Sequence, residues 1–231
     1  MQKIEVNHTV ENYLRALYRI QTREGKASNV ALARELAISP SAVTEMARKL
    51  GQAGLVSYQR YKGLALMPEG LRLAIGVTRR HRLWEVFLIE HLRFSWDEVH
   101  ELADELEHIG SALLIDRLEQ FLEFPTHDPH GDPIPTREGR IVEQKLVALI
   151  DLEPGEDGVV HRVSDEGPEL LRYASSLGLS ISASVHVIER IPFDSSVRLT
   201  ADGKEGVISE KLASSIFVAR AEPRRVRKGR V

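Results

Sequence analysis

A break at Ser39-Pro40, between two short helical patterns, is the feature that most limits what this chain can fold into. The residues before it, 28–37, place apolar side chains at helical spacing behind a serine or asparagine suited to cap a helix. Proline suits the first turn of the second helix, 41–54. Two short helices joined by a tight turn predict a helix-turn-helix. The alternative is an ordinary helical hairpin packed in a core.

The segment that follows, 55–67, alternates apolar and polar residues on either side of a basic turn, which is typical of a β-hairpin. Helix, turn, helix and hairpin together predict a winged helix. The second helix would enter the major groove, where short polar side chains reach base edges, while basic residues of the hairpin contact phosphates. The expected DNA contacts are Ser39, Ser41, Ala42, Thr44, Glu45 and Arg48 on the helix, with Arg60 and Lys62 on the hairpin.

Charge is distributed unevenly along the chain. Residues 1–80 hold 13 Lys and Arg against 6 Asp and Glu, a net of +7, and residues 222–231 hold a net of +4. Since the whole chain carries −3, the segment 81–221 carries −14. A basic end joined to an acidic middle predicts a head that binds a polyanion and a body that binds cations.

The acidic middle contains a helix, predicted over 97–108, that gathers metal-ligand side chains. At about 100° per residue, one arc of this helix holds His100, Asp104, Glu107 and His108. The opposite side is apolar, with Leu102, Leu106, Ile109 and Leu113. The alternative is that the polar arc is the solvated face of a surface helix. On a preceding long helix that starts at Pro68, His81 and Glu85 lie one turn apart and project from one face.

The remaining segments predict a connector and a small β domain. Prolines and a glycine in 125–135 exclude regular structure, and a rigid connector is favoured there over a second metal site. Residues 136–151 are amphipathic and are expected to begin the last unit. Short β-like runs follow, with one helix at 168–177 and hairpin-turn chemistry at 201–204, as in a small barrel. The basic tail after Pro223 is expected to be solvated rather than a DNA arm.

The fold class is therefore α+β, with expected domain bounds of 1–74 (winged helix), 75–150 (helical, metal-binding and dimerising) and 151–231 (small barrel with a basic tail). Apolar surface on three consecutive helices favours a homodimer. The chain has no cysteine, so a metal would be held by His, Asp, Glu and backbone oxygen. The absence of an export signal or a long apolar stretch predicts a cytoplasmic protein that does not cross a membrane.

Five motifs in order give the chain a resemblance to the diphtheria toxin repressor family of metal-dependent transcription regulators, over essentially its full length. They are SPSAVTEMARKL, YQRYKGLALMPEG, HRLWE at 81–85, VHELADELEH at 99–108 and DPHGDPIP at 128–135. The first two look most like the manganese transport regulator branch. The third domain resembles the SH3-like domain of the iron-sensing branch, which the manganese branch typically lacks.

The resemblance implies two metal sites per subunit. The primary site corresponds to Asp104, Glu107 and His108 with a residue of the first helix, either Asn12 or its neighbour Glu11. The ancillary site corresponds to His81, Glu85, His100, Glu166 and Glu169. A carboxylate at position 104, where iron-sensing members have cysteine, favours Mn²⁺, with Fe²⁺ as the alternative.

The function implied is that of a regulator, most often a repressor of metal-uptake genes. Its partners are a second copy of the chain and a palindromic double-stranded DNA operator, bound when metal is abundant, with no small-molecule substrate. An Fe²⁺-responsive regulator is the near alternative. A helical di-metal hydrolase or oxidase and a winged-helix regulator without metal dependence are the distant ones, because no separate nucleophile or acid-base constellation stands out.

Overall fold

The computed structural model describes residues 4–59, 63–142, 144–164 and 167–221. The chain divides into two compact units. Unit 1 comprises Met1–Trp84, Leu102–Thr126 and Ile134–Ile141, and unit 2 comprises Glu85–Glu101, His127–Pro133 and Val142–Val231. Within the described ranges, no helix is both long and apolar enough to cross a membrane.

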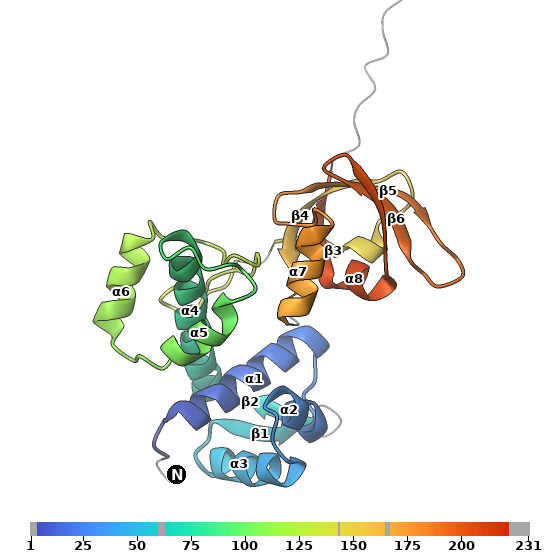
Figure 1. Ribbon diagram of the computed structural model, residues 1–231. Helices are drawn as coiled ribbons and strands as arrows, with labels where there is room; N and C mark the ends of the chain where they lie inside the picture. The colour runs from blue at the N-terminus through green and yellow to red at the C-terminus, as the bar shows by residue number, and fades with distance from the viewer. Residues whose placement is uncertain (1–3, 60–62, 143, 165–166, 222–231) are drawn as a thin grey trace, which may run out of the picture. The chain divides into compact units, whose positions relative to one another are not determined.

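Unit 1 begins with the winged helix expected from the sequence (Figure 1). Its elements are α1 (His8–Glu24), α2 (Asn29–Glu35), α3 (Pro40–Gln52), β1 (Val56–Gln59) and β2 (Gly63–Leu66). Each helix starts at a side-chain cap: Asn7, Ser28 and Ser39 accept hydrogen bonds from backbone amides three residues on. Apolar side chains from all three helices and the hairpin form one buried core.

Two glycines let the hairpin and the next helix pack closely against this core. Gly63, with φ of +76°, pairs with Gln59 across the hairpin, and a Cβ on it would overlap the carbonyl oxygen of Ala27. The adjacent Leu64 amide donates to that same oxygen at 2.9 Å. Gly70 is pressed equally closely against the carbonyl oxygen of Leu55. Side chains larger than hydrogen are excluded at both positions.

The central helices are α4 (Pro68–Glu90), α5 (Val99–Leu106) and α6 (Ala112–Phe121). The polar arc predicted around α5 is partly buried: the Glu107 side chain is 1% exposed, whereas that of Asp104 is 46% exposed. Of the apolar residues predicted for the opposite side, Leu102 and Leu106 on α5 are partly buried, whereas Ile109 after α5 is 39% exposed and Leu113 on α6 is 69% exposed. The solvated-face alternative does not hold for Glu107.

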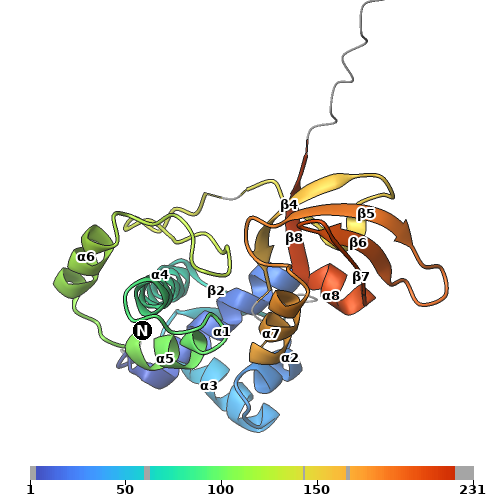
Figure 2. The same cartoon turned by 45° about the horizontal axis from the view of Figure 1, so that its top comes forward.

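Unit 2 contains an antiparallel sheet with strand order β3-β8-β4-β5-β6-β7. Its strands are β3 (Val147–Ala148), β4 (Asp157–Val163), β5 (Ser184–Arg190), β6 (Val197–Ala201), β7 (Lys204–Ile208) and β8 (Ile216–Arg220). The short helix η1 (Leu149–Asp151) and the helices α7 (Pro168–Ser176) and α8 (Glu210–Ser215) pack on the curved sheet (Figures 1 and 2). The expected hairpin turn is present, with positive φ at Asp202 and Gly203. The α+β class and the small β domain are confirmed.

The amphipathic run 136–151 begins with a turn. Gly139 adopts φ of +79° and closes a turn by donating to the Thr136 carbonyl at 2.8 Å, and Thr136 donates to Arg140 across it. The residues after this turn lead into β3 and η1. The sequence reading also missed α8, which begins at a Ser209 cap. Amphipathic spacing alone does not show whether a segment forms a helix or a turn.

Candidate metal centre

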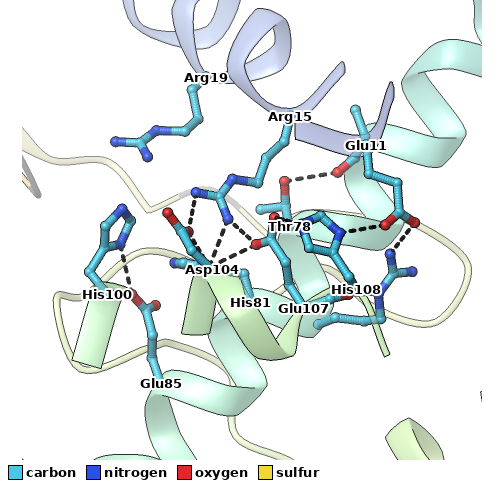
Figure 3. A network of polar contacts seen from close by, with 12 residues as sticks. Glu11, Arg15, Arg19, Thr78, His81, Glu85, His100, Asp104, Glu107 and His108 are labelled. Carbon is cyan, nitrogen blue, oxygen red and sulfur yellow. Dashed lines mark hydrogen bonds and ion pairs between the residues drawn. The ribbon is translucent and has the colours of Figure 1, made fainter. Parts of the chain in front are cut away.

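In unit 1, two carboxylates from α5 and the turn after it meet an arginine from α1 (Figure 3). The Arg15 guanidinium donates to Asp104 Oδ1 from Nη2 at 2.6 Å and to Glu107 Oε2 from Nη1. The Arg15 side chain is 10% exposed and that of Glu107 is 1% exposed. Asp104, at 46%, is open to solvent on one side. A buried anion is thus compensated by a nearly buried cation.

His81, on α4, is part of the same cluster. Its Nδ1 lies 2.9 Å from Glu107 Oε2, 3.2 Å from Asp104 Oδ1 and 2.8 Å from Arg15 Nη1. The resemblance placed His81 with the ancillary residues. The geometry brings it to two residues of the primary site as well, so this imidazole is within reach of an ion held there.

The first helix reaches this cluster through Glu11. Glu11 Oε2 lies 2.6 Å from His108 Nδ1, and its other oxygen accepts from Arg80 Nη2 at 2.6 Å. The His8 ring stacks on His108, with ring centroids 4.2 Å apart. Asn12 is exposed. Of the two first-helix candidates, Glu11 makes the contact with a proposed ligand, and it lies one turn before Arg15 on the same face of α1.

The donor chemistry of this cluster fits a hard or borderline divalent cation. Glu11, Asp104 and Glu107 supply carboxylate oxygens, and His81 and His108 supply imidazole nitrogens. Two guanidinium groups, Arg15 and Arg80, provide the positive charge that a cation would provide. Buried carboxylates without such charge would be costly. Oxygen and imidazole donors without thiolate suit Mn²⁺ and Fe²⁺.

A second cluster lies in unit 2 around Glu85, whose side chain is 2% exposed. Glu85 Oε1 lies 3.3 Å from His100 Nδ1 and 3.7 Å from His130 Nε2. His130 is 1% exposed, and neither of its ring nitrogens has a hydrogen-bond partner among the residues described. The Trp96 ring lies 5.8 Å away. A buried imidazole without a hydrogen-bond partner, beside a buried carboxylate, fits the donor chemistry of a metal site.

Sequence reasoning set His130 aside because it lies in the connector. The connector is held against β4, since a Cβ on Gly131, whose φ is +87°, would overlap the His161 carbonyl oxygen. One sequence feature could have identified His130 as a candidate ligand: it lies beside a glycine and prolines that fix the position of the connector. Glu169 is exposed in the first turn of α7, and within the described part of the chain no hydrogen bond or ion pair joins it to this cluster. Glu166 lies outside the described residues.

The candidate DNA contacts of α3 are all exposed on one end of the helix: Ser39, Ser41, Ala42, Thr44, Glu45 and Arg48. Several are already ordered by local hydrogen bonds. Ser39 caps α3 and bonds Ser41 at 2.9 Å, and Thr44 accepts from Asn29 at 3.0 Å. Glu45 pairs with Lys49 at 2.8 Å, and this hydrogen bond lowers the pKa of the Glu45 carboxyl. Arg60 and Lys62 lie outside the described residues.

Comparison with known protein families finds three matches along the chain. Residues 5–64 match the iron dependent repressor N-terminal DNA binding domain, and residues 67–136 match its metal binding and dimerisation domain. Residues 147–220 match the FeoA domain. The matches together cover the winged helix, the central helices and the β domain.

Individual relatives agree with these matches. The diphtheria toxin repressor of Corynebacterium efficiens is 28% identical over 224 residues, which is 93% of this chain and 96% of that one. The iron-dependent repressor IdeR of Mycobacterium leprae is 31% identical over 154 residues, 64% of this chain and 67% of that one. A solved manganese-dependent transcriptional repressor in complex with manganese superposes with a TM-score of 0.86 at 35% identity, covering 92% of this chain and 100% of that one.

The buried carboxylate and histidine cluster, the winged helix and the full-length similarity lead to one assignment. The chain belongs to the iron-dependent repressor family, also known by the diphtheria toxin repressor, whose members are metal-dependent DNA-binding transcriptional repressors and not enzymes.

Proposed function

We propose that this protein is a Mn²⁺-responsive repressor of metal-uptake genes that binds a palindromic operator as a homodimer when loaded with metal. The observation that carries the proposal is the meeting of α1 with the ligand-bearing turn after α5. Glu11, from a helix in the core of the winged helix, lies 2.6 Å from His108. An ion held there would connect metal concentration to the helix that supports α3. As a DNA-binding regulator, the protein would act in the cytoplasm.

The proposed primary site comprises Glu11, Asp104, Glu107 and His108, with His81 within reach. Glu11 is preferred to Asn12 because it is partly buried and contacts His108, whereas Asn12 is exposed. The donors are oxygens and imidazole nitrogens, which favours Mn²⁺ over softer ions. Fe²⁺ is the alternative metal, since the mycobacterial relative is named an iron-dependent repressor. When bound, the cation would supply positive charge that neutralises the carboxylates and fixes their positions.

The proposed ancillary site is centred on Glu85, with His100 and His130 as nitrogen donors. The buried ring nitrogens of His130 support its inclusion, because an unsatisfied buried imidazole is costly without a partner. His81 remains a candidate for this site from the sequence resemblance alone. Glu166 and Glu169 remain candidates from the sequence resemblance. Two sites per subunit are therefore proposed.

Exposed apolar side chains support the homodimer. They lie on α6 and on the segments directly before and after it, with exposed fractions from 39% to 69%: Ile109, Leu113, Leu114, Phe121 and Phe124. Apolar surface of this extent on consecutive elements is typical of an interface between subunits. The match of residues 67–136 to a dimerisation domain points the same way. A twofold dimer presents two copies of α3, which suits a palindromic operator.

Coupling between metal and DNA follows from the position of α1. Val10, Leu14 and Leu17 of α1 pack in the same core as Val43 and Leu50 of α3. The Tyr13 hydroxyl also donates to the Val43 carbonyl oxygen at 3.2 Å. Constraining Glu11 relative to His108 would therefore constrain α3. Two ligands that favour one arrangement of the same element must strengthen each other's binding.

The test is operator binding with and without metal. A duplex selected from a random-sequence library in the presence of Mn²⁺ serves as the probe in a fluorescence anisotropy titration. We expect the affinity to fall by about tenfold or more on chelation, within the range of measured allosteric couplings, and His108→Ala to abolish the response. His186→Ala is the matched control, because His186 is an exposed histidine paired with Asp157 on the β domain.

Three outcomes would count against the proposal. Equal DNA affinity with and without Mn²⁺ would remove metal dependence and favour a constitutive winged-helix regulator. A response to Fe²⁺ but not to Mn²⁺ under anaerobic conditions would select the iron alternative. Loss of the response in His186→Ala would show that the effect of His108→Ala is not specific to the site.

A further inference from the structure

Arg15 occupies the position between the carboxylates that the proposed function gives to a metal ion. One guanidinium nitrogen bonds Glu107 and lies 2.8 Å from His81, and the other bonds Asp104. Figure 3 shows the guanidinium pointing into this group from α1. One side chain thus contacts three of the proposed donors at once.

The guanidinium and a metal ion would need the same atom. Glu107 Oε2 is the atom that accepts from Arg15, and it is also the carboxylate oxygen 2.9 Å from His81 Nδ1. Arginine remains charged at all relevant pH values and cannot itself coordinate a cation. A divalent ion bound between Glu107 and Asp104 would therefore meet a positive charge at contact distance unless Arg15 moved away.

We propose that Arg15 is an internal competitor for the primary site: its guanidinium neutralises Glu107 and Asp104, and metal binds only by displacing it. This inference rests on the proposed function. Arg15 thereby lowers the apparent metal affinity and raises the metal concentration at which the repressor is loaded. The competition occurs at a residue of α1, the helix proposed to transmit the metal signal to α3.

The rival explanation is that Arg15 positions the two carboxylates for the ion and so assists binding. The two roles predict opposite signs for the removal of Arg15. A competitor, once removed, leaves metal binding tighter. A positioning residue, once removed, leaves it weaker because the carboxylates lose their orientation. Both roles also predict a less stable protein in chelator, because buried Glu107 loses its counter-charge when Arg15 is removed. An unchanged stability would show that Arg15 plays neither role.

The experiment measures Mn²⁺ dissociation constants by isothermal titration for the wild type, Arg15→Gln, Arg15→Lys and Arg72→Gln. Arg72 supplies the matched control, because it removes one charge from an exposed pair with Glu69 on α4. We expect Arg15→Gln to bind Mn²⁺ about tenfold to a hundredfold more tightly, since charged hydrogen bonds no longer oppose binding. In chelator, the same variant should melt at a lower temperature than the wild type. Arg72→Gln should change neither quantity.

Arg15→Lys keeps the charge but cannot bridge both carboxylates, so it should bind Mn²⁺ with an intermediate affinity and fold even if Arg15→Gln does not. If the wild type binds Mn²⁺ and the Arg15 variants bind it equally or more weakly, the inference is overturned but the proposed function is not. A wild-type protein that binds no Mn²⁺ would overturn the proposed function and the inference with it.

Discussion

The ion pair between Arg15 and Glu107 predicts that substitutions at these two positions will be strongly non-additive. Glu107→Gln removes the charge of a side chain that is 1% exposed and leaves the Arg15 guanidinium, 10% exposed, without its buried partner. Arg15→Gln has the reciprocal effect on Glu107. Replacing both leaves two neutral amides of similar size, which can bond each other. The double variant should therefore be more stable than either single variant.

The expected magnitudes follow from burial. Removing one partner of a buried ion pair costs about 3 to 5 kcal/mol. Glu107→Gln should fall near the lower end, at about 3 kcal/mol, because Arg15 keeps its bond to the half-exposed Asp104. The double variant should lose about 1 kcal/mol, since neutral replacement of a buried ion pair is often nearly neutral. With each single variant losing about 3 kcal/mol or more, the coupling energy is at least about 5 kcal/mol, above the usual range for contacting residues.

Urea unfolding in chelator measures these energies. The chain has two tryptophans, so in a Trp96→Phe background the fluorescence of Trp84, three residues beyond His81 on α4, reports the unfolding of this helix. The same cycle at the exposed pair Glu69 and Arg72 is the control, with a coupling below about 0.5 kcal/mol. Additive losses at Arg15 and Glu107, within the error of the control cycle, would refute the buried ion pair as described.

Four further predictions concern the rest of the molecule. Gly70→Ala should destabilise unit 1 by about 2 kcal/mol or more in urea unfolding, because the new Cβ overlaps the Leu55 carbonyl, whereas Gly206→Ala, with open space around it, should not. Ser39→Ala should cost about 1 kcal/mol by the same measurement, through loss of the α3 cap. Hydrogen bonds from Ser95 and then Arg172 hold the pKa of Asp97 below its usual range. Because this folded-state pKa is depressed, the stability it contributes is complete above the ordinary carboxyl range and is lost as pH falls through the folded value; Asp97→Asn should flatten the acid limb of a stability-pH curve. Lys62→Ala should weaken operator and random DNA equally and reduce the salt slope by about one in anisotropy titrations, and a changed operator preference would contradict its assignment to the wing.

Local signals in the sequence were sufficient for most of the fold. The caps at Ser28 and Ser39 and the proline at position 40 place helix starts where the structure has them, because caps act through backbone amides within one turn. The hairpin turn at Asp202 and Gly203 is equally local. The amphipathic spacing of 136–151 did not predict the turn at Gly139, because spacing carries no information about a single positive φ.

The same local signals predicted only part of the candidate site. A helical wheel collects His100, Asp104, Glu107 and His108 on one side, but it cannot say which side is buried. Burial of Glu107 depends on Arg15, which is 92 residues away in sequence. The proximity of His130 to Glu85 depends on the packing of the connector against β4. Contacts of this kind are tertiary and leave no periodic signal in the sequence.

The contacts of Arg15 also bear on how metal binding would be coupled to DNA binding. If metal simply drew α1 and the turn after α5 together, the coupling to DNA would come from gaining that contact. Arg15 already joins α1 to Asp104 and Glu107, and Glu11 already joins it to His108. Under the proposed function, metal would instead change the position that α1 takes with each cation, since a ligand shifts an equilibrium only through its differential affinity for two arrangements. Glu11 and Arg15 lie one turn apart on α1, so exchanging the arginine contact for a tighter hold on Glu11 would move the point of attachment along the helix. A change of attachment of this kind would be transmitted through the Tyr13 contact to α3.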